Sequence, residues 1–238
     1  MEDPASAIDD LPGLRRQLML KALEIVPFEG WHKSTLEMAC RALDIEATDA
    51  MHACPGGVRD LVVEFQEWGD ELMVGRLEEL DLASMRMRDR IALAVKTRLE
   101  MATGYREVVR QMLAFFALPV NGQAGARALW HTSDRIWVFL GDQSDDINWY
   151  SKRATLSAVL ASSVLYWLGD SGDGTATGEF VDRRIDNVMQ LEKLKSGLRR
   201  APGGTELMIR IDNCLRFVRP PAHRPERYPG WLRPVSRD

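Results

Sequence analysis

Residues 28–45 read FEGWHKSTLEMACRALDI, and they place a glycine stop signal before two short helical patterns. One helix face before this stretch carries apolar residues at Leu14, Leu18, Ala22 and Ile25. Pro27 and Gly30 are expected to end that first helix. A short second helix is expected over residues 34–43 and a shorter third helix over residues 48–54. Three helices in this order are typical of a helix-turn-helix unit.

The rest of the chain has helical periodicity almost throughout. Expected helices cover residues 58–82, 85–103, 105–117, 123–141, 147–169, 178–196 and 205–218. The inward face of the first of these is expected to carry Leu61, Phe65, Trp68, Leu72 and Leu80. Residues 119–122 are one of the expected breaks, because they contain proline, asparagine and glycine. Alternating strand-like runs are absent from the sequence, which therefore predicts an all-α bundle of about ten helices.

The order of the N-terminal motifs resembles the DNA-binding unit of TetR-type repressors. The motifs that carry this resemblance are Phe28-Glu29-Gly30-Trp31, Thr35-Leu36-x-x-Ala39, Ala42-Leu43-Asp44-Ile45 and Gly57-x-x-Asp60-Leu61. Asp44, Glu46 and Asp49 lie on or beside the helix that would enter the major groove. No Lys or Arg lies between Arg41 and Arg59. Because acids there would repel phosphates, we expect a degenerate helix-turn-helix and no nucleic-acid partner. A TetR-type DNA-binding transcriptional regulator is the alternative.

A second motif block lies between the helices expected over residues 123–141 and 147–169. Residues 134–153 read DRIWVFLGDQSDDINWYSKR. This block resembles the Coq-nine family of ubiquinone (coenzyme Q) biosynthesis accessory proteins. The matching residues are Asp134-x-x-Trp137, Gly141-Asp142-x-Ser144-x-Asp146 and Asn148-Trp149-Tyr150-x-Lys152-Arg153. The resemblance extends over about residues 11–195.

This resemblance implies a TetR-like fold that binds lipid. It also implies a homodimer without catalytic activity. The implied ligand is an isoprenoid quinone or a phospholipid. The implied partners are the hydroxylase that acts on demethoxyubiquinone and an anionic membrane surface. The resemblance also implies a partner and membrane patch formed by Asp134, Trp137, Asp142, Asp146, Trp149, Tyr150, Lys152 and Arg153. In the alternative interpretation, Trp149 and Tyr150 pack on the bundle. Asp142 and Asp146 are expected to combine helix capping with ion pairs to Lys152 or Arg153.

The helix expected over residues 147–169 is apolar on two sides and carries many small residues. Such a helix is wrapped by other helices or lines a cavity. We predict a lipid pocket between this helix and the helices at residues 105–117 and 123–141. Its expected lining is Leu113, Phe116, Ile136, Leu140, Leu160 and Val164. Ordinary core packing, in a dimeric scaffold without ligand, is the alternative explanation.

Motifs for catalysis or metal binding are not found. Glu29 and His32 form a single Glu-x-x-His pattern at a turn, whereas a di-iron bundle needs two such motifs. The widely spaced Cys40, Cys54 and Cys214 fit reduced thiols better than disulfides. No apolar run reaches the roughly 18 residues of a membrane-spanning helix. We therefore expect a binding protein with no catalytic residue, metal or cofactor.

Charge separates the C-terminal segment from the rest of the chain. Residues 193–238 carry eleven Lys or Arg against four acids, although the whole chain has a net charge of −4. One face of the helix expected over residues 205–218 is formed by Leu207, Met208, Ile211, Leu215 and Val218. An apolar helix face flanked by bases is typical of a membrane-surface helix. A helix docked on the dimer and a solvated tail are the alternatives.

These patterns predict three segments. A degenerate helix-turn-helix unit is expected over residues 1–57, and a lipid-binding and dimerisation bundle over residues 58–198. The third segment, residues 199–238, is a basic tail with the amphipathic helix. Because the first ten residues are acidic, no targeting peptide is expected there. The predicted location is cytoplasmic, peripheral on the inner (cytoplasmic) membrane.

Overall fold

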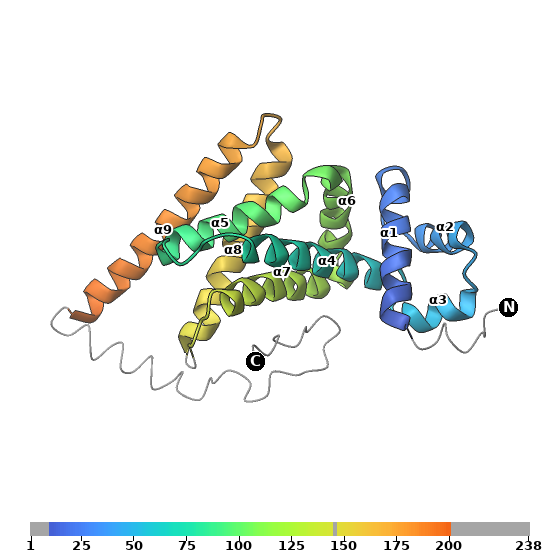
Figure 1. The fold of residues 1–238 in the computed structure, drawn as a ribbon, viewed down its shortest axis with the longest axis horizontal. Coiled ribbons are helices and arrows are strands. Elements are labelled where there is room, and N and C mark those ends of the chain that lie inside the picture. The colour runs from blue at the N-terminus through green and yellow to red at the C-terminus, as the bar shows by residue number, and fades with distance from the viewer. Residues whose placement is uncertain (1–9, 145–146, 201–238) are drawn as a thin grey trace. The chain divides into compact units, whose positions relative to one another are not determined.

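A computed structural model describes residues 10–144 and 147–200 of the chain, and within these residues it is entirely helical (Figure 1). The described helices are α1 (Leu11–Glu29), α2 (Lys33–Leu43), α3 (Ala47–Ala53), α4 (Val58–Glu78), α5 (Met87–Met101), the 3-10 helix η1 (Thr103–Tyr105), α6 (Arg106–Ala117), α7 (Pro119–Phe139), α8 (Ile147–Gly169) and α9 (Thr175–Arg200). The predicted all-α class is confirmed. The helix predicted over residues 205–218 lies outside the described residues.

The tertiary contacts divide the chain into two compact units. The first comprises Met1–Arg76 with Thr97–Thr132, and the second comprises Leu77–Lys96 with Ser133–Asp238. The long helices α4, α5 and α7 each contribute to both units. The three functional segments expected from the sequence stay a prediction.

Helix α1 begins at an acidic cap and ends at a glycine. The Asp10 carboxylate accepts the N–H of Gly13 at 3.0 Å, which satisfies one free donor of the first turn. The prediction that Pro27 ends the helix is wrong, because the helix continues to Glu29. Proline removes only one N–H, and so close to the end of a helix this leaves few bonds to disturb. Gly30 ends the helix at φ +72°, a left-handed conformation that favours glycine, and its N–H bonds to the Val26 carbonyl.

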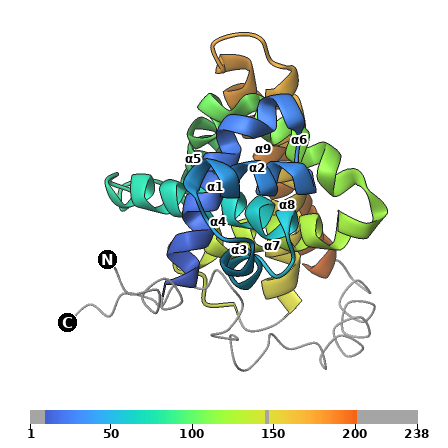
Figure 2. The same ribbon diagram turned by 90° about the vertical axis from the view of Figure 1, so that its right-hand side faces the viewer.

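The first unit contains the expected three-helix arrangement of α1, α2 and α3 (Figure 2). Asp44 makes the turn between α2 and α3 in the left-handed region, at φ +54°. The N–H of Ile45 then bonds to the Cys40 carbonyl at 3.0 Å. Arg15 ties α1 to the end of α3, because its Nε donates to the Ala53 carbonyl at 2.7 Å.

An aromatic cluster fills part of the core of the first unit. Tyr105 meets Phe65 and Trp68 edge to face, with ring centroids 5.9 and 5.5 Å apart. Trp31 packs on Phe65 at 6.2 Å and donates its indole N–H to the Val108 carbonyl. These contacts join α4 to the segment just before α2 and to η1 and α6. The helix-turn-helix therefore packs against the aromatic core of the first unit.

The first unit also contains a buried ion-pair network. Asp70 of α4 accepts Nε of Arg98 at 2.8 Å and Oγ1 of Thr132 at 2.9 Å, and its side chain is 1% exposed. Burial acts to raise the pKa of Asp70, but hydrogen bonding from His131 and the charge of Arg98 outweigh it and lower that pKa. A Cβ at Gly69 would lie 2.6 Å from the Arg98 guanidinium, so a larger residue there would force the guanidinium to shift.

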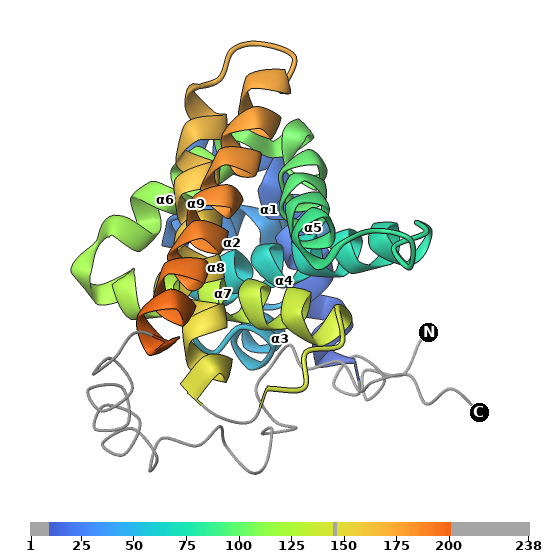
Figure 3. The same cartoon turned by 90° about the vertical axis from the view of Figure 1, so that its left-hand side faces the viewer.

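In the second unit, α8 packs along α9 (Figure 3). Tyr166 stacks on Phe180 with ring centroids 4.3 Å apart. The Asp170 carboxylate accepts both Oγ1 and the backbone N–H of Thr177, which closes the turn between the two helices. Ion pairs then tie α9 to α5, including Lys96 with Asp182 at 2.8 Å.

The break predicted at residues 119–122 is wrong. Helix α6 ends at Ala117 and α7 begins at Pro119, so only Leu118 separates them. Proline fits the first position of a helix because the N–H it lacks has no partner there. Among the described residues, no helix combines the length and apolar character needed to cross a membrane.

Candidate functional site

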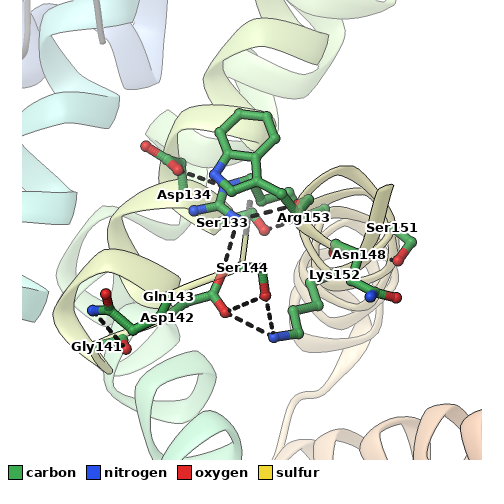
Figure 4. Close-up of polar contacts among 11 residues, drawn as sticks. Ser133, Asp134, Gly141, Asp142, Gln143, Ser144, Asn148, Ser151, Lys152 and Arg153 are labelled. Atoms are coloured by element: carbon green, nitrogen blue, oxygen red, sulfur yellow. Dashed lines mark hydrogen bonds and ion pairs between the residues drawn. The ribbon is translucent and has the colours of Figure 1, made fainter. Parts of the chain in front are cut away.

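The second motif block forms one polar network where the end of α7, the loop after it and the start of α8 meet (Figure 4). Helix α7 supplies Ser133 and Asp134, and the loop supplies Asp142 and Ser144. Helix α8 supplies Trp149, Tyr150, Lys152 and Arg153. All of these residues belong to the second unit.

Arg153 lies at the centre of this network and is completely buried. Its Nε donates to Oδ1 of Asp134 at 2.5 Å, and its Nη1 donates to Oδ2 of Asp142 at 3.1 Å. The same Nη1 donates to the Trp149 carbonyl, and the guanidinium carbon lies 4.0 Å from the centroid of the Trp149 ring. Two carboxylates and one aromatic face therefore compensate the cost of burying this charge.

Lys152 extends the network toward solvent. Its Nζ donates to Oδ1 of Asp142 at 2.7 Å and to Oγ of Ser144 at 2.6 Å, while its side chain is 38% exposed. Burial acts to raise the pKa of Asp142, but hydrogen bonds from Lys152, Ser144 and Arg153 outweigh it and lower that pKa. The expected pairing of Asp142 with Lys152 and Arg153 is thus confirmed.

The Gly-Asp pair in the motif has a geometric role. Gly141 adopts φ +77°, and its N–H bonds to the Val138 carbonyl. The N–H of Asp142 reaches back to the Trp137 carbonyl at 2.9 Å. This pattern is a Schellman helix ending, in which glycine permits the left-handed residue. The ending turns the Asp142 carboxylate toward α8.

Ser133 is a positioning residue that the sequence analysis did not identify. Its Oγ is fully buried with the residue and donates to the backbone carbonyl of Arg153 at 2.9 Å. An isolated serine in a helix carries no positional information, so the sequence contains no signal for this role. The bond fixes the backbone of α8 against α7 at the level of the network.

Two buried donors of the network have no hydrogen-bond partner among the described residues: Nε1 of Trp137 and Nη2 of Arg153. The carboxylates of Asp134 and Asp142 are engaged by cations, so neither is placed as a free general base. No group of His, Cys, Asp or Glu suited to a metal ion occurs in the part of the chain that the structure describes. The arrangement is suited to holding side chains in place.

The structure corrects the expectation that all eight motif residues lie at the surface. Asp134 and Arg153 are buried, and the Asp142 side chain is 3% exposed, because they satisfy one another's charges inside the unit. Trp149 and Tyr150 are half-buried and meet edge to face at 4.8 Å. Trp137 is also half-buried, with Nζ of Lys152 5.2 Å from its ring centroid. Asp146 lies outside the described residues. A partner-binding role for the half-buried aromatic residues stays a prediction.

The six predicted pocket residues are distributed over both units. Leu113 and Phe116 are half-buried in α6 of the first unit. In the second unit, Ile136 and Leu160 are buried, and Leu140 and Val164 are half-buried. The lipid pocket stays a prediction. The predicted membrane-helix residues Leu207, Met208, Ile211, Leu215 and Val218 lie outside the described residues.

The sequence profile of the COQ9 family matches residues 122–192, a range that contains the whole network. This stretch is a COQ9-family region. Ubiquinone biosynthesis protein COQ9, mitochondrial, from Xenopus tropicalis and from Homo sapiens is 30% identical over 186 residues in each case. Those matches cover 75% of this chain and 58% of each relative. The resemblance to the COQ9 family expected from the sequence is confirmed.

A more distant relative is the probable ubiquinone biosynthesis protein coq9, mitochondrial, of Dictyostelium discoideum. It is 25% identical over 199 residues, covering 81% of this chain and 65% of that protein. The chain thus spans less than two thirds of the length of these relatives. The crystal structure of a TetR transcriptional regulator from Nitrosomonas europaea ATCC 19718 matches with a TM-score of 0.58 and 14% identity. The matched region covers 73% of this chain and 97% of the regulator chain, so the TetR-like fold is confirmed.

The predicted cytoplasmic location, peripheral on the inner membrane, is wrong. The COQ9 relatives are named mitochondrial proteins, and this finding contradicts the cytoplasmic prediction. The prediction rested on the acidity of the first ten residues. Since the chain spans 58% of the length of its vertebrate relatives, those residues do not decide targeting.

Proposed function

We propose that this chain is a non-catalytic accessory protein of ubiquinone biosynthesis. It binds an isoprenoid quinone intermediate between its helices and presents it to the hydroxylase that acts on demethoxyubiquinone. It works as a homodimer at a membrane surface, which residues 205–218 contact. Support comes from the names of the COQ9 relatives and from the match over residues 122–192.

The observation that carries this proposal is the way the network holds Trp149. The buried Arg153 guanidinium lies against one part of the indole and also bonds to the Trp149 carbonyl. Both the ring and its backbone are therefore fixed before any partner arrives. A half-exposed aromatic residue on a rigid base loses little conformational entropy on binding, which is typical of an interface anchor.

DNA binding is a poorer explanation of the same fold. Helix α3 exposes Met51 and His52, and the adjoining Glu46 is also exposed. No Lys or Arg lies between Arg41 and Arg59, so α3 itself offers no Lys or Arg to DNA phosphates. The TetR similarity at 14% identity concerns the fold alone.

Mass spectrometry of lipids extracted from the purified protein tests the proposal. We expect a prenylated quinone or quinone precursor to co-purify. The variant Ala161→Trp, at a half-buried position of α8, is expected to lower the amount of bound lipid while leaving helicity intact. Ala158→Trp, at an exposed position of the same helix, is the matched control and is expected to retain the lipid. Purified protein free of prenylated lipid, or equal lipid in both variants, would contradict lipid binding by this bundle.

A further inference from the structure

The turn between α6 and α7 presents a continuous apolar surface. Residues 117–120 read Ala-Leu-Pro-Val, and all four are exposed. Leu118 is 53% exposed and Val120 is 78% exposed. Single exposed apolar residues are ordinary on a protein surface, but four in succession at the tip of a helical hairpin form a patch. This turn between α6 and α7 lies within the first unit.

The turn is built to hold these side chains outward. Nδ2 of Asn121 donates to the Phe115 carbonyl at 3.1 Å, which closes the turn from inside. The N–H groups of Asn121 and Gly122 both bond to the Leu118 carbonyl, at 2.9 and 3.0 Å. Phe116 packs against Gly125, where a Cβ would lie 2.8 Å from the Phe116 side chain. The turn is therefore fixed by four local contacts.

The charges along this hairpin favour an anionic surface. No Asp or Glu occurs between Glu107 and Asp134, a stretch that includes the tip and most of both helices. Arg110 and Arg127 are the arginines of this stretch, and both are exposed. Arg110 forms an ion pair with Glu107, which leaves Arg127 as the arginine whose charge can act on a surface. An anionic surface that meets the tip is thus attracted by Arg127 and meets no acid of the same stretch.

We infer that the turn at residues 117–120 inserts into the headgroup region of an anionic lipid bilayer. This contact is additional to the one proposed for residues 205–218, and it rests on the membrane location in the proposed function. A convex tip of small aliphatic residues fits lipid better than protein. Protein interfaces are anchored by Trp, Tyr and Arg, and none of these lies among the four residues.

Flotation of the full-length protein with vesicles of phosphatidylcholine and phosphatidylglycerol tests this contact. Val120→Asp is expected to lower the vesicle partition coefficient about tenfold, because a charge replaces an inserted apolar group. Met51→Asp is the control, since Met51 is 69% exposed in the same unit but lies on α3 beside acidic residues. It is expected to float like the unmodified protein. Equal flotation of the two variants would overturn the proposal.

A fluorescent probe distinguishes lipid from other occupants of the tip. Val120→Cys is labelled with an environment-sensitive dye after Cys40→Ser and Cys214→Ser. Cys54 can remain, because burial raises its pKa to about 11 and keeps its thiol unreactive. Vesicles are expected to shift the dye emission to the blue. An unshifted emission would exclude insertion into lipid, and a change of oligomeric state in Val120→Asp would assign the tip to a protein contact. Either result would overturn the inference.

The quinone profile of cells separates this inference from the proposed function. If Val120→Asp floats normally but the chain still lowers demethoxyubiquinone in cells, the tip contact is overturned and the proposed function stands. If the unmodified chain leaves the quinone profile unaltered, the proposed function fails whatever the vesicles show.

Discussion

Two buried arginines organise the two units of the molecule in different ways. Arg98 pairs with Asp70, whose oxygens also accept a bond from Thr132, so this network ends inside the first unit. Arg153 pairs with two carboxylates in the second unit, and its guanidinium lies over the half-buried Trp149 ring. The same ion-pair chemistry therefore stabilises a core in one place and fixes a surface side chain in the other. The following predictions test that difference.

The largest effect is expected for the Asp70–Arg98 network of the first unit. Asp70→Ala leaves Arg98 buried without its carboxylate, and breaking a buried pair in this way costs about 3–5 kcal/mol. Urea unfolding measures the loss. Glu24→Ala removes an exposed ion pair with Lys21 and is expected to cost less than about 1 kcal/mol. If Asp70→Ala were as mild as Glu24→Ala, the network would not stabilise the core.

A smaller effect of a different kind is expected for Trp149→Ala. Loss of an interface anchor weakens binding by about 2 kcal/mol, or about thirtyfold, so pull-down of the hydroxylase should fall strongly. The melting temperature should fall only slightly because the ring is half-buried. Trp31→Ala is the core control and is expected to cost about 3–5 kcal/mol of folding stability. Unaltered hydroxylase binding would remove Trp149 from the interface.

Acid should destabilise the Arg153 network of the second unit, because protonation of Asp142 removes a charge that pairs with Lys152 and Arg153. The pKa of Asp142 is lower in the folded state than the ordinary value of 3.8, so its contribution to stability is complete above that value. This contribution is lost as the pH falls through the lowered folded-state pKa. Between about pH 6 and 2, the free energy of unfolding measured in urea should therefore fall less steeply for Asp142→Asn than for the unmodified chain. Asp44→Asn, at an exposed turn, serves as control. The same loss of unfolding free energy on acidification in Asp142→Asn and in the unmodified chain would contradict this role.

The smallest effect is expected for Trp137→Phe. Nε1 of Trp137 has no hydrogen-bond partner among the described residues, so phenylalanine removes a donor without breaking a bond. Lys152 keeps an aromatic ring beneath it, and the stability change should stay within about 1 kcal/mol. A loss above about 2 kcal/mol in thermal unfolding would show that this indole N–H has an acceptor in solution.

The helices were largely predictable because apolar periodicity reports which face is buried. The errors come from local chemistry that periodicity does not contain. The predicted breaks at Pro27 and Pro119 are wrong, because Pro27 is accommodated near the end of a helix and Pro119 begins one. On α4, Leu72 was expected to face inward but is 37% exposed, while the charged Asp70 is buried. A hydrophobic pattern cannot place a buried acid whose partner lies on another helix.

The candidate site was found from its motif, but its orientation was not. Gly141 and Asp142 were recognisable, and the ion pairs of Asp142 followed from opposite charges close in sequence. The burial of Arg153 was not predictable, because arginine is almost always exposed unless a partner satisfies it. That partner includes Asp134, which approaches only after α7 and α8 pack together. The supporting bond from Ser133 has no sequence signal at all.

The quinone profile of cells that lack their own COQ9 relative tests the central claim most directly. Mass spectrometry would compare demethoxyubiquinone with ubiquinone in cells that carry an empty vector, the full chain or its Trp149→Ala variant. We predict that the full chain lowers the ratio of demethoxyubiquinone to ubiquinone and that Trp149→Ala, expressed at the same level, does not. A ratio that is the same with the full chain as with the empty vector would contradict a role of this protein in ubiquinone biosynthesis.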